Sequence, residues 1–386
     1  MVKEELANRP DNTAFTQQRL PAWQPMLSAG IVIPGFLVIG LAFIGIGVAL
    51  FVTSQGIQVL ELEYTGEQRT SPCYKCSDPT VKDCVCNLEF SITTLFKGPV
   101  FFYYGLSNYF QNYRKYGVSK DDQQLYGDLN NFKVGENTQL VYPSSLCYFP
   151  VFFQFLFFRS IKQNTCTKER KGMHFIFLFL PQSPSEYCAP YQYDSNKKPI
   201  VPCGSIANSM FNDTFKLYHL VNGTKKVVPF DGKGIAWWTD YNIKYRNPSV
   251  SPLKNAFNDT VKPLFWPKAA YELDPNDPAN NGFINQDFLV WIRTAALPDF
   301  RKLYRRITEG DYAEGLPAGN YVLEIGYNYP VLSFDGTKKV VFSNVSWMGG
   351  KNEFLGIAYL VIGSLCIVMS IVMLIVYAKF KFPDEE

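Results

Sequence analysis

Histidine is scarce in this sequence, which has two in 386 residues, His174 and His219. Two histidines cannot supply a histidine-based metal cluster, and they leave little capacity for general-base catalysis. The motifs G-x-S-x-G and H-E-x-x-H and a Cys/His dyad are also missing, so the sequence does not indicate a hydrolase or a zinc protease. We therefore predict a protein that is not an enzyme and has no catalytic residues, no metal site and no cofactor.

An excess of charge of one sign is missing as well. The 37 Lys and Arg residues nearly balance the 34 Asp and Glu residues, which leaves a net charge of +3. This small charge, without a basic stretch interleaved with aromatic residues, argues against nucleic-acid binding. Apolar residues make up 47% and aromatic residues 16% of the chain, so it can build a core and is not disordered.

Charged residues are absent from two long stretches of the chain. The first runs from Leu20 to Leu60 and contains an almost wholly apolar run at 31–52, and the second is 354–378. A helix of about 20 such residues, rising 1.5 Å per residue, covers the ~30 Å hydrocarbon core of a bilayer. We predict transmembrane helices at 30–52 and 354–378. The first apolar run is too long for a cleaved signal peptide, so we expect it to be retained.

The charges that flank these helices predict the topology. Basic residues lie at the outer ends of both helices, and Glu61, Glu63 and Glu67 follow the first helix; the basic residues are Arg9, Arg19, Lys379 and Lys381. Because Lys and Arg favour the cytosolic side, residues 1–29 and 379–386 are predicted cytosolic tails. Residues 53–353 are then a lumenal or extracellular ectodomain.

Sequons and cysteines agree with this location. Four N-x-S/T sequons lie within 53–353, and we predict them as glycosylation sites: Asn212, Asn222, Asn258 and Asn344. Eight of the nine cysteines lie there too, and the ninth, Cys366, is expected to be a small apolar residue of the second helix. Together these features favour an oxidising, glycosylating compartment.

Four cysteines crowd into 14 residues: Cys73, Cys76, Cys84 and Cys86. Such a group binds zinc in many cytosolic proteins, but in an oxidising compartment disulfides form first. Four cysteines allow three pairings. Residues that face each other on the two arms of a hairpin have residue numbers with a nearly constant sum, and the nested pairs Cys73–Cys86 and Cys76–Cys84 satisfy this condition. Asp78-Pro79 would supply the turn. Cys188 and Cys203 form the natural third pair.

The ectodomain alternates short aromatic and β-branched runs with Asn-, Gly- and Pro-rich turns. Examples are 100–104, 321–327 and 339–343, with 334–337 as a hairpin turn before the last. We predict a membrane protein whose two helices flank a large, mainly β ectodomain, which is disulfide-bonded, antiparallel and sandwich-like, with a few short helices.

One helix is predicted at 285–307, interrupted at Pro298. The basic residues of its second part form either a solvated helix face, the simpler interpretation, or a docking surface for an acidic partner: Arg301, Lys302, Arg305 and Arg306.

Three further motifs have a structural and a functional interpretation. Trp237, Trp238 and Tyr241 are either core residues, the simpler prediction, or anchors of an interface. Glycines of the first helix favour close packing against another helix over phosphate binding: Gly35, Gly40 and Gly47. Residues 274–285 superficially match a calcium loop. If Gly282 is aligned with the glycine at the sixth loop position, however, Phe288 falls at the twelfth, where a bidentate carboxylate is required. We therefore predict a turn.

Residues 132–183 differ from the rest of the ectodomain. They hold two Phe-dense runs around a basic patch, together with Cys147 and Cys166. The run 137–158 is long enough to span a membrane, but Pro143 and Pro150 interrupt it, so we predict no third span. We interpret the segment as an insertion.

Several motifs resemble the cell cycle control protein fifty family. They are Arg9–Pro25 (RPDNTAFTQQRLPAWQP), Tyr103–Asn108 (YYGLSN), Pro202–Thr214 (PCGSIANSMFNDT), Gly234–Asp240 (GIAWWTD), Gly282–Pro298 (GFINQDFLVWIRTAALP) and Ser346–Lys351 (SWMGGK). These long motifs are specific, and the resemblance covers the chain apart from roughly 132–183.

The resemblance implies an accessory (beta) subunit of a P-type lipid-flippase ATPase. Such a subunit caps the lumenal loops of the ATPase, packs its helices beside it, and is needed for exit from the endoplasmic reticulum and for the phosphoenzyme cycle. The ATPase carries the chemistry, moving aminophospholipids to the cytosolic leaflet. The expected location is the endoplasmic reticulum, Golgi, secretory vesicles and plasma membrane. Family disulfides fall on the same three cysteine pairs, and family glycans on Asn212 and approximately Asn222.

Two departures and one alternative remain. A family sequon is lost at Glu324-Ile-Gly, and the insertion at 132–183 adds about fifty residues. Our hypothesis for the insertion is an unusual splice form or an erroneous gene model. The alternative function is a stand-alone adhesion or receptor glycoprotein, which would need no ATPase.

Overall fold

The computed structural model describes residues 12–21, 28–78, 80–81, 83–129 and 184–380. The chain divides into two compact units, a helical unit and a β unit. The helical unit extends to Gln58 and resumes at Val345, and the β unit comprises Val59–Asn344. The predicted insertion 132–183, with Cys147 and Cys166, lies outside the described residues.

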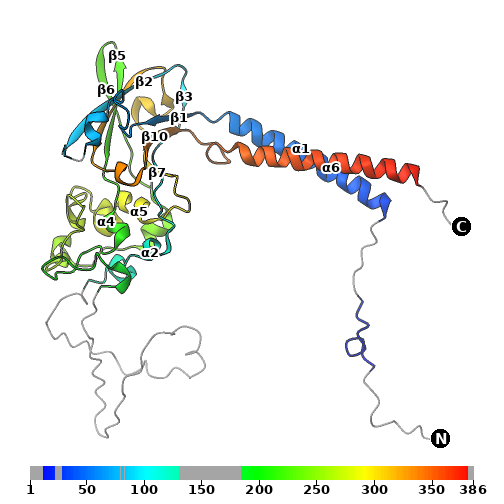
Figure 1. Ribbon diagram of the computed structural model, residues 1–386, viewed down its shortest axis with the longest axis horizontal. Coiled ribbons are helices and arrows are strands. Elements are labelled where there is room, and N and C mark those ends of the chain that lie inside the picture. Colours follow the sequence, from blue (N-terminus) through cyan, green and yellow to red (C-terminus); the bar gives the residue numbers. More distant parts are fainter. Residues whose placement is uncertain (1–11, 22–27, 79, 82, 130–183, 381–386) are drawn as a thin grey trace, which may run out of the picture. The chain divides into compact units, whose positions relative to one another are not determined.

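The helical unit consists of two long helices, α1 (Ala29–Gln55) and α6 (Glu353–Lys379) (Figure 1). Each has 27 residues and is long and apolar enough to cross a membrane. The two predicted membrane helices are therefore confirmed as helices. Asn352 caps α6, because its side-chain oxygen accepts the backbone N–H of Phe354 at 3.1 Å.

Two four-stranded antiparallel sheets build the β unit. Their strand orders are β1-β10-β4-β7 and β2-β9-β5-β6, and β3 pairs with β8. The strands are β1 (Val59–Glu63), β2 (Cys84–Ile92), β3 (Phe96–Lys97), β4 (Val100–Leu106), β5 (Thr214–Val221), β6 (Thr224–Val228), β7 (Phe300–Ile307), β8 (Gly315–Leu316), β9 (Gly319–Tyr327) and β10 (Lys338–Ser343). The strands predicted at 100–104, 321–327 and 339–343 lie within β4, β9 and β10.

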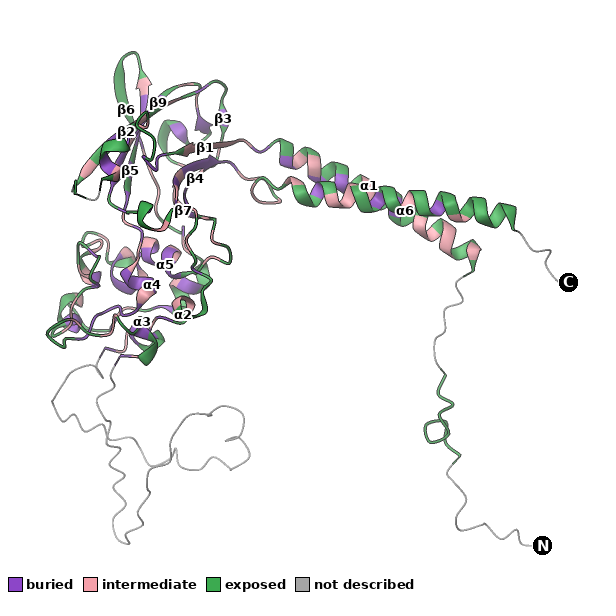
Figure 2. Ribbon diagram, viewed as in Figure 1, coloured by how far each residue is buried: buried purple, intermediate pink, exposed green. Residues whose placement is uncertain are grey.

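The inner faces of the two sheets share one aromatic core. Phe102 of β4 lies 5.3 Å from Phe215 of β5 and 4.7 Å from Phe342 of β10, between ring centroids. Phe90 of β2 lies 5.6 Å from Phe342. Buried residues follow the strands of both sheets in Figure 2. This contact across the sheets confirms the predicted sandwich-like fold.

Two long connections, from β4 to β5 and from β6 to β7, contribute a lobe of short helices. The indole N–H of Trp291 donates to the carbonyl of Ile206 at 2.8 Å, and that of Trp266 to the carbonyl of Ala207 at 2.6 Å. The α-helices are α2 (Arg114–Gly117), α3 (Asp122–Leu125), α4 (Ser205–Asn208) and α5 (Gln286–Ile292), and a π-helix covers η6 (Asp240–Lys244). The 3₁₀ turns of the β unit are η1 (Tyr74–Ser77), η5 (Glu186–Cys188), η7 (Leu253–Phe257), η8 (Ala270–Glu272), η9 (Pro278–Asn280), η10 (Gly282–Ile284), η11 (Gly310–Tyr312) and η12 (Leu332–Phe334).

The helix predicted at 285–307 is wrong in its second half. Helix α5 ends at Ile292, and 300–307 form strand β7, which pairs with β4. Pro298 ends any helix that approaches it, and β4 offers residues 300–307 a pairing partner at the edge of its sheet. Tertiary pairing therefore decides the structure of this basic segment.

The hairpin predicted at 334–337 is also wrong. Asp335 does adopt the left-handed conformation of a turn, with φ of 53°. The strands on either side, β9 and β10, belong to different sheets, however. The turn therefore carries the chain from one sheet of the sandwich to the other.

Candidate functional site

Three disulfides stabilise the β unit: Cys73–Cys86, Cys76–Cys84 and Cys188–Cys203. The first two have the nested arrangement, but their segment is not a two-stranded hairpin. Cys73 precedes the 3₁₀ turn η1 and Cys76 lies in it. Their partners, Cys86 and Cys84, lie in β2, which pairs with β9. The disulfides thus attach an irregular segment to a sheet. Cys366 of α6 is a free cysteine.

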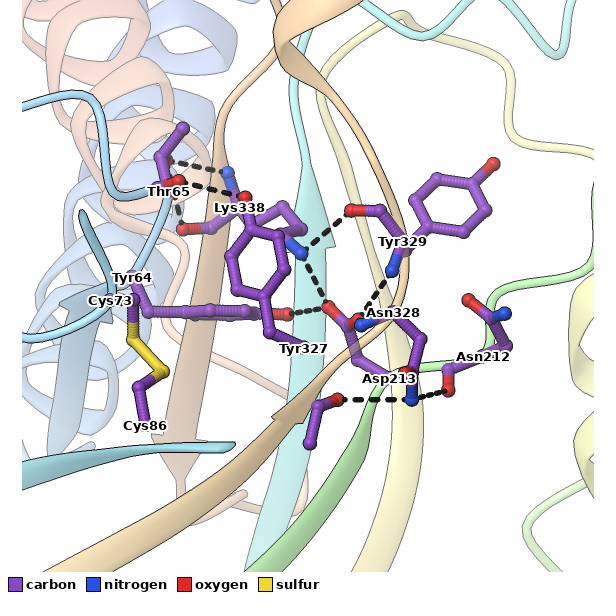
Figure 3. A network of polar contacts seen from close by, with 11 residues as sticks. Tyr64, Thr65, Cys73, Cys86, Asn212, Asp213, Tyr327, Asn328, Tyr329 and Lys338 are labelled. Atoms are coloured by element: carbon purple, nitrogen blue, oxygen red, sulfur yellow. Dashed lines mark hydrogen bonds and ion pairs between the residues drawn. A yellow bond between two sulfur atoms is a disulfide. The ribbon is translucent and has the colours of Figure 1, made fainter. Parts of the chain in front are cut away.

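A buried polar network joins the two sheets (Figure 3). At its centre, Lys338 donates from Nζ to Asp213 Oδ2 at 2.8 Å and to the carbonyl of Tyr329 at 2.7 Å. The side chains of Lys338 and Asp213 are both 0% exposed. The hydroxyl of Tyr64 donates to the same carboxylate oxygen at 2.9 Å. Backbone N–H groups of Asn328 and Tyr329 donate to Oδ1 at 2.6 and 2.7 Å.

The electrostatics of this network favour a fixed structural ion pair. Burial lowers the pKa of Lys338 to about 8, and the Asp213 carboxylate opposes that shift. The Lys338 ammonium also lies 3.1 Å from the ring centroid of Tyr327. Burial, and next the charge of Asp213, raise the pKa of Tyr64 well above its usual value of 10, so its hydroxyl stays a donor. Because four donors already fill the carboxylate, its role is to hold the sheets together.

A second buried lysine, Lys302 of β7, has a different environment. Its Nζ donates to the backbone carbonyls of Val290, Trp291 and Arg293, at 3.0, 2.7 and 2.6 Å. These carbonyls end helix α5, so Lys302 caps that helix from a neighbouring strand. Burial and the nearby charge of Arg293 lower the pKa of Lys302 to about 7.

The other basic residues of β7 are ion-paired or exposed. Arg305 forms a two-bond ion pair with Asp287, and Arg306 pairs with Asp231 at 3.0 Å. Arg301 is exposed and lies over the ring of Tyr103. The predicted solvated helix face is therefore wrong, because this segment is a strand and most of its charges have partners within the β unit.

Trp237 and Trp238 are exposed, so their prediction as core residues is wrong. Trp237 is 62% exposed and Trp238 is 68% exposed, whereas Tyr241 is partly buried against the core. The guanidinium of Arg293 lies 3.8 Å from the ring centroid of Trp237 and pairs with Asp240 at 3.1 Å. These side chains form an aromatic surface held in place by an ion pair.

Small residues line the contact between α1 and α6. A Cβ on Gly40 would lie 2.9 Å from the carbonyl of Gly363, and one on Gly47 would lie 3.0 Å from the amide of Leu360. The buried small residues repeat every seven positions on each helix: Gly40, Gly47 and Ser54 on α1, and Gly356, Gly363 and Ser370 on α6. The close-packing prediction holds for Gly40 and Gly47, while Gly35 has no described neighbour within 4 Å of such a Cβ.

The four sequons differ in exposure. Asn222 is exposed at the β5–β6 turn, where Asn222 and Gly223 both have positive φ, and Asn258 is exposed as well. Asn212 is partly buried, and its amide oxygen is buried without a hydrogen-bond partner in the described chain. Asn344 is 9% exposed. Glycosylation of all four remains a prediction.

The segment that superficially matched a calcium loop forms two 3₁₀ turns, η9 and η10. Asp274 accepts hydrogen bonds from the backbone of Asp277 and from the side chain of Asn280. Asn281 accepts from the backbone of Gly282 and donates to the carbonyl of Tyr271. Across the described residues, no three His, Cys, Asp or Glu side chains gather as a metal site requires.

The sequence did not indicate that Lys302 and Lys338 are buried. Lys338 and Asp213 lie 125 positions apart, and in the sequence Asp213 is marked only by the Pro202–Thr214 motif and by the sequon at Asn212 that contains it. No local pattern distinguishes a lysine that will be buried from one that will be solvated. Contact between the sheets alone brings this pair together.

Comparison with known proteins gives one consistent family. The sequence matches the family described as LEM3 (ligand-effect modulator 3) family / CDC50 family over residues 50–149 and 161–383. It is 49% identical to cell cycle control protein 50A of Mus musculus over 378 residues, covering 97% of this chain and 90% of that one. It is 48% identical to cell cycle control protein 50B of Homo sapiens over 389 residues, covering 98% and 97%. It is 34% identical to ALA-interacting subunit 3 of Arabidopsis thaliana over 375 residues, covering 96% and 87%.

The match enters the predicted insertion from both sides. Of residues 132–183, only 150–160 lie outside the two matched ranges, so the unmatched segment is narrower than the motifs had indicated. The matched ranges contain both sheets, all three disulfides and the second long helix. On the extent of this match and on identities of up to 49%, the chain is a member of the LEM3/CDC50 family.

Proposed function

We propose that this protein is the non-catalytic accessory (beta) subunit of a P-type phospholipid-flippase ATPase. The observation that carries the proposal is family membership across almost the whole chain. The name of the Arabidopsis relative, ALA-interacting subunit 3, describes a subunit that interacts with a partner. In this role the protein supports folding of the ATPase, its exit from the endoplasmic reticulum and its transport of aminophospholipids to the cytosolic leaflet.

The architecture suits such a role. The small residues between α1 and α6 let the two helices pack closely. Large apolar side chains remain exposed along both helices, where they can contact lipid or the helices of a partner. The β unit combines a sandwich core with three disulfides, which makes it a rigid platform. We propose that both termini are cytosolic and that residues 53–353 face the lumen of the secretory pathway or the cell exterior.

The topology proposal includes glycans at Asn212, Asn222, Asn258 and Asn344. We expect the exposed Asn222 and Asn258 to be most fully occupied and the buried Asn344 least, because a folded glycoprotein must accommodate the attached sugar. Glycopeptide mass spectrometry measures each occupancy. Unmodified peptides at all four sites would contradict the lumenal assignment.

The experiment that tests the function is a mild-detergent purification of the tagged, full-length chain, followed by mass spectrometry. We expect a P-type flippase ATPase to co-purify at near-equal stoichiometry. Stable, surface-delivered protein without an ATPase would favour the adhesion or receptor alternative. Repeating the purification with residues 132–183 deleted tests whether the insertion affects assembly.

A further inference from the structure

Two adjacent tryptophans on the surface of the β unit invite an explanation. Trp237 and Trp238 are 62% and 68% exposed, although each carries a large apolar ring that would gain by burial. Tyr241 and Arg293 lie beside them. Trp, Tyr and Arg are the residue types that dominate binding energy at protein interfaces. We call these four residues the tryptophan patch.

Three residues of the tryptophan patch, Trp237, Tyr241 and Arg293, are held in place before any partner arrives. Arg293 lies 3.8 Å from the ring centroid of Trp237, and the buried Asp240 fixes the guanidinium at 3.1 Å. The carbonyl of Trp237 accepts the backbone N–H groups of Asp240 and Tyr241, both at 3.0 Å. The hydroxyl of Tyr241 donates to the carbonyl of Ala279 at 2.7 Å. Much of the ordering entropy that binding would cost is therefore lost already on folding.

A cavity of about 480 Å³ opens beside the patch. Trp238, Tyr241 and Ala236 contribute apolar surface. The remaining lining includes amide side chains, the ammonium-bearing Lys233 and the carboxylate-bearing Asp277. It has room for several side chains of a partner loop. Such a pocket next to exposed aromatic rings is the arrangement in which interface anchors pair with those of the partner.

The charges around the patch define the kind of partner. Lys233 and Lys244 are exposed, and neither ammonium group pairs with a carboxylate among the described residues. Of the nearby carboxylates, Asp240 pairs with Arg293, whereas Asp277 accepts the backbone N–H of Ala279 and keeps its negative charge. The two lysines outweigh this single carboxylate. The charge left to attract a partner is therefore positive, so a complementary surface carries Asp or Glu.

From these observations we infer that the tryptophan patch is a binding hot spot for an apolar protein loop that carries carboxylates. The inference rests on the proposed function and extends it: the loop belongs to the exoplasmic side of the flippase ATPase. Trp237 and Trp238 pack against its apolar side chains, and Lys233 and Lys244 face its carboxylates.

The test uses the tagged, full-length chain co-expressed with a P-type flippase ATPase and purified in mild detergent. The variants are Trp237→Ala, Trp238→Ala and Lys233→Glu, and the matched control is Phe265→Ala, a residue that is 64% exposed on another segment. Folding of each variant is measured independently, by its melting temperature and by disulfide formation on non-reducing gels.

We expect each Trp variant to keep the wild-type melting temperature and to retain at least about tenfold less ATPase. Lys233→Glu is expected to lower capture about threefold and to make it less sensitive to salt. Phe265→Ala should capture as the wild type does. Wild-type capture by both Trp variants, or an equal loss in Phe265→Ala, would overturn the hot spot while leaving the proposed function intact. Failure of the wild type itself to capture the ATPase would overturn the proposed function, and this partner with it.

Discussion

Lys338 and Lys302 of the β unit are both buried, and each ammonium group must replace the water it loses with protein acceptors. The two lysines do so in different ways. Lys338 pairs with the carboxylate of Asp213, which receives three further donors. Within the described part of the chain no carboxylate lies within bonding distance of Lys302, which donates to three backbone carbonyls. Both lysines lose hydration, and burial lowers the pKa of both.

The difference teaches what each lysine does for the fold. Lys338 and Asp213 depend on each other, because either charge left alone would be buried without compensation. They join β10 to the segment that precedes β5, so their pairing locks the two sheets together. Lys302 leaves no opposite charge behind when it is removed. Its hydrogen bonds connect the end of α5 to the edge strand β7, so its effect is confined to these two neighbouring elements.

The largest expected effect comes from breaking the ion pair. Lys338→Met leaves Asp213 buried with its charge uncompensated, which should lower the free energy of unfolding by ~3–5 kcal/mol. Chemical denaturation of the full-length protein in detergent measures this. The matched control is Lys339→Met, whose pair with Glu61 is about half exposed and contributes at most ~1 kcal/mol.

A double variant sharpens this prediction. Asp213→Asn keeps an N-x-T sequon at Asn212 and, combined with Lys338→Met, removes both charges. We expect the double variant to be more stable than the sum of the single losses implies. Additive losses would mean that the two charges do not stabilise each other.

The second effect comes from the lysine without a carboxylate. Lys302→Met leaves three carbonyls at the end of α5 without their donor, and should lower the free energy of unfolding by ~2–3 kcal/mol. The exposed neighbour Arg301→Met is the control and should change it by less than ~0.5 kcal/mol. The comparison fails if Lys302→Met destabilises as much as Lys338→Met.

A smaller effect isolates one bond of the ion-pair network. Tyr64→Phe keeps the ring near Lys338 and removes only the hydroxyl that donates to Asp213. Loss of a hydrogen bond to a charged group should cost ~1.5 kcal/mol in the same denaturation assay. Tyr377→Phe in α6, an exposed tyrosine, is the control. Equal stability of Tyr64→Phe and wild type would show that Lys338 and the two backbone donors satisfy the carboxylate without the hydroxyl of Tyr64.

The smallest effect is a difference in pH dependence. Lys302 has a folded pKa of about 7, below the usual 10.5, so between these values the unfolded chain binds a proton that the folded chain does not. The free energy of unfolding therefore rises with pH, by about 1 kcal/mol per pH unit for one such group. For Lys338 the rise begins near pH 8. Denaturation midpoints at pH 7 and 8 should rise in wild type and less in Lys302→Met; equal slopes would contradict the prediction.

Sequence patterns predicted much of this architecture where the signal lies in contiguous residues. The uncharged runs at 31–52 and 354–378 identified both long helices, and aromatic β-branched runs identified β4, β9 and β10. The errors lie where distant segments compete for the chain. Residues 300–307 form a strand because β4 offers a partner, and β10 joins β1 and β4 instead of pairing with β9.

The surface of the β unit was predicted less well than its core. Trp237 and Trp238 are large apolar residues of the kind that usually lie in a core, yet they are exposed in the segment just before the π-helix η6. Conversely, Lys302 and Lys338 have the composition of surface residues but are 7% and 0% exposed. Residue type predicts burial on average, and the packing of neighbouring elements decides it for the individual side chain.

The sequence by itself determined the two long apolar helices, the disulfide-bonded β unit and the family, because long apolar runs, cysteine spacing and extended motifs are properties of contiguous residues. Only the tertiary structure decided the partners of the buried charges, the assignment of strands to sheets and the exposure of the tryptophans. Many of these contacts join segments far apart in the sequence, as with Asp213 and Lys338, which are 125 positions apart. Their contacts form only when the two sheets close over a common core, and no local pattern records them.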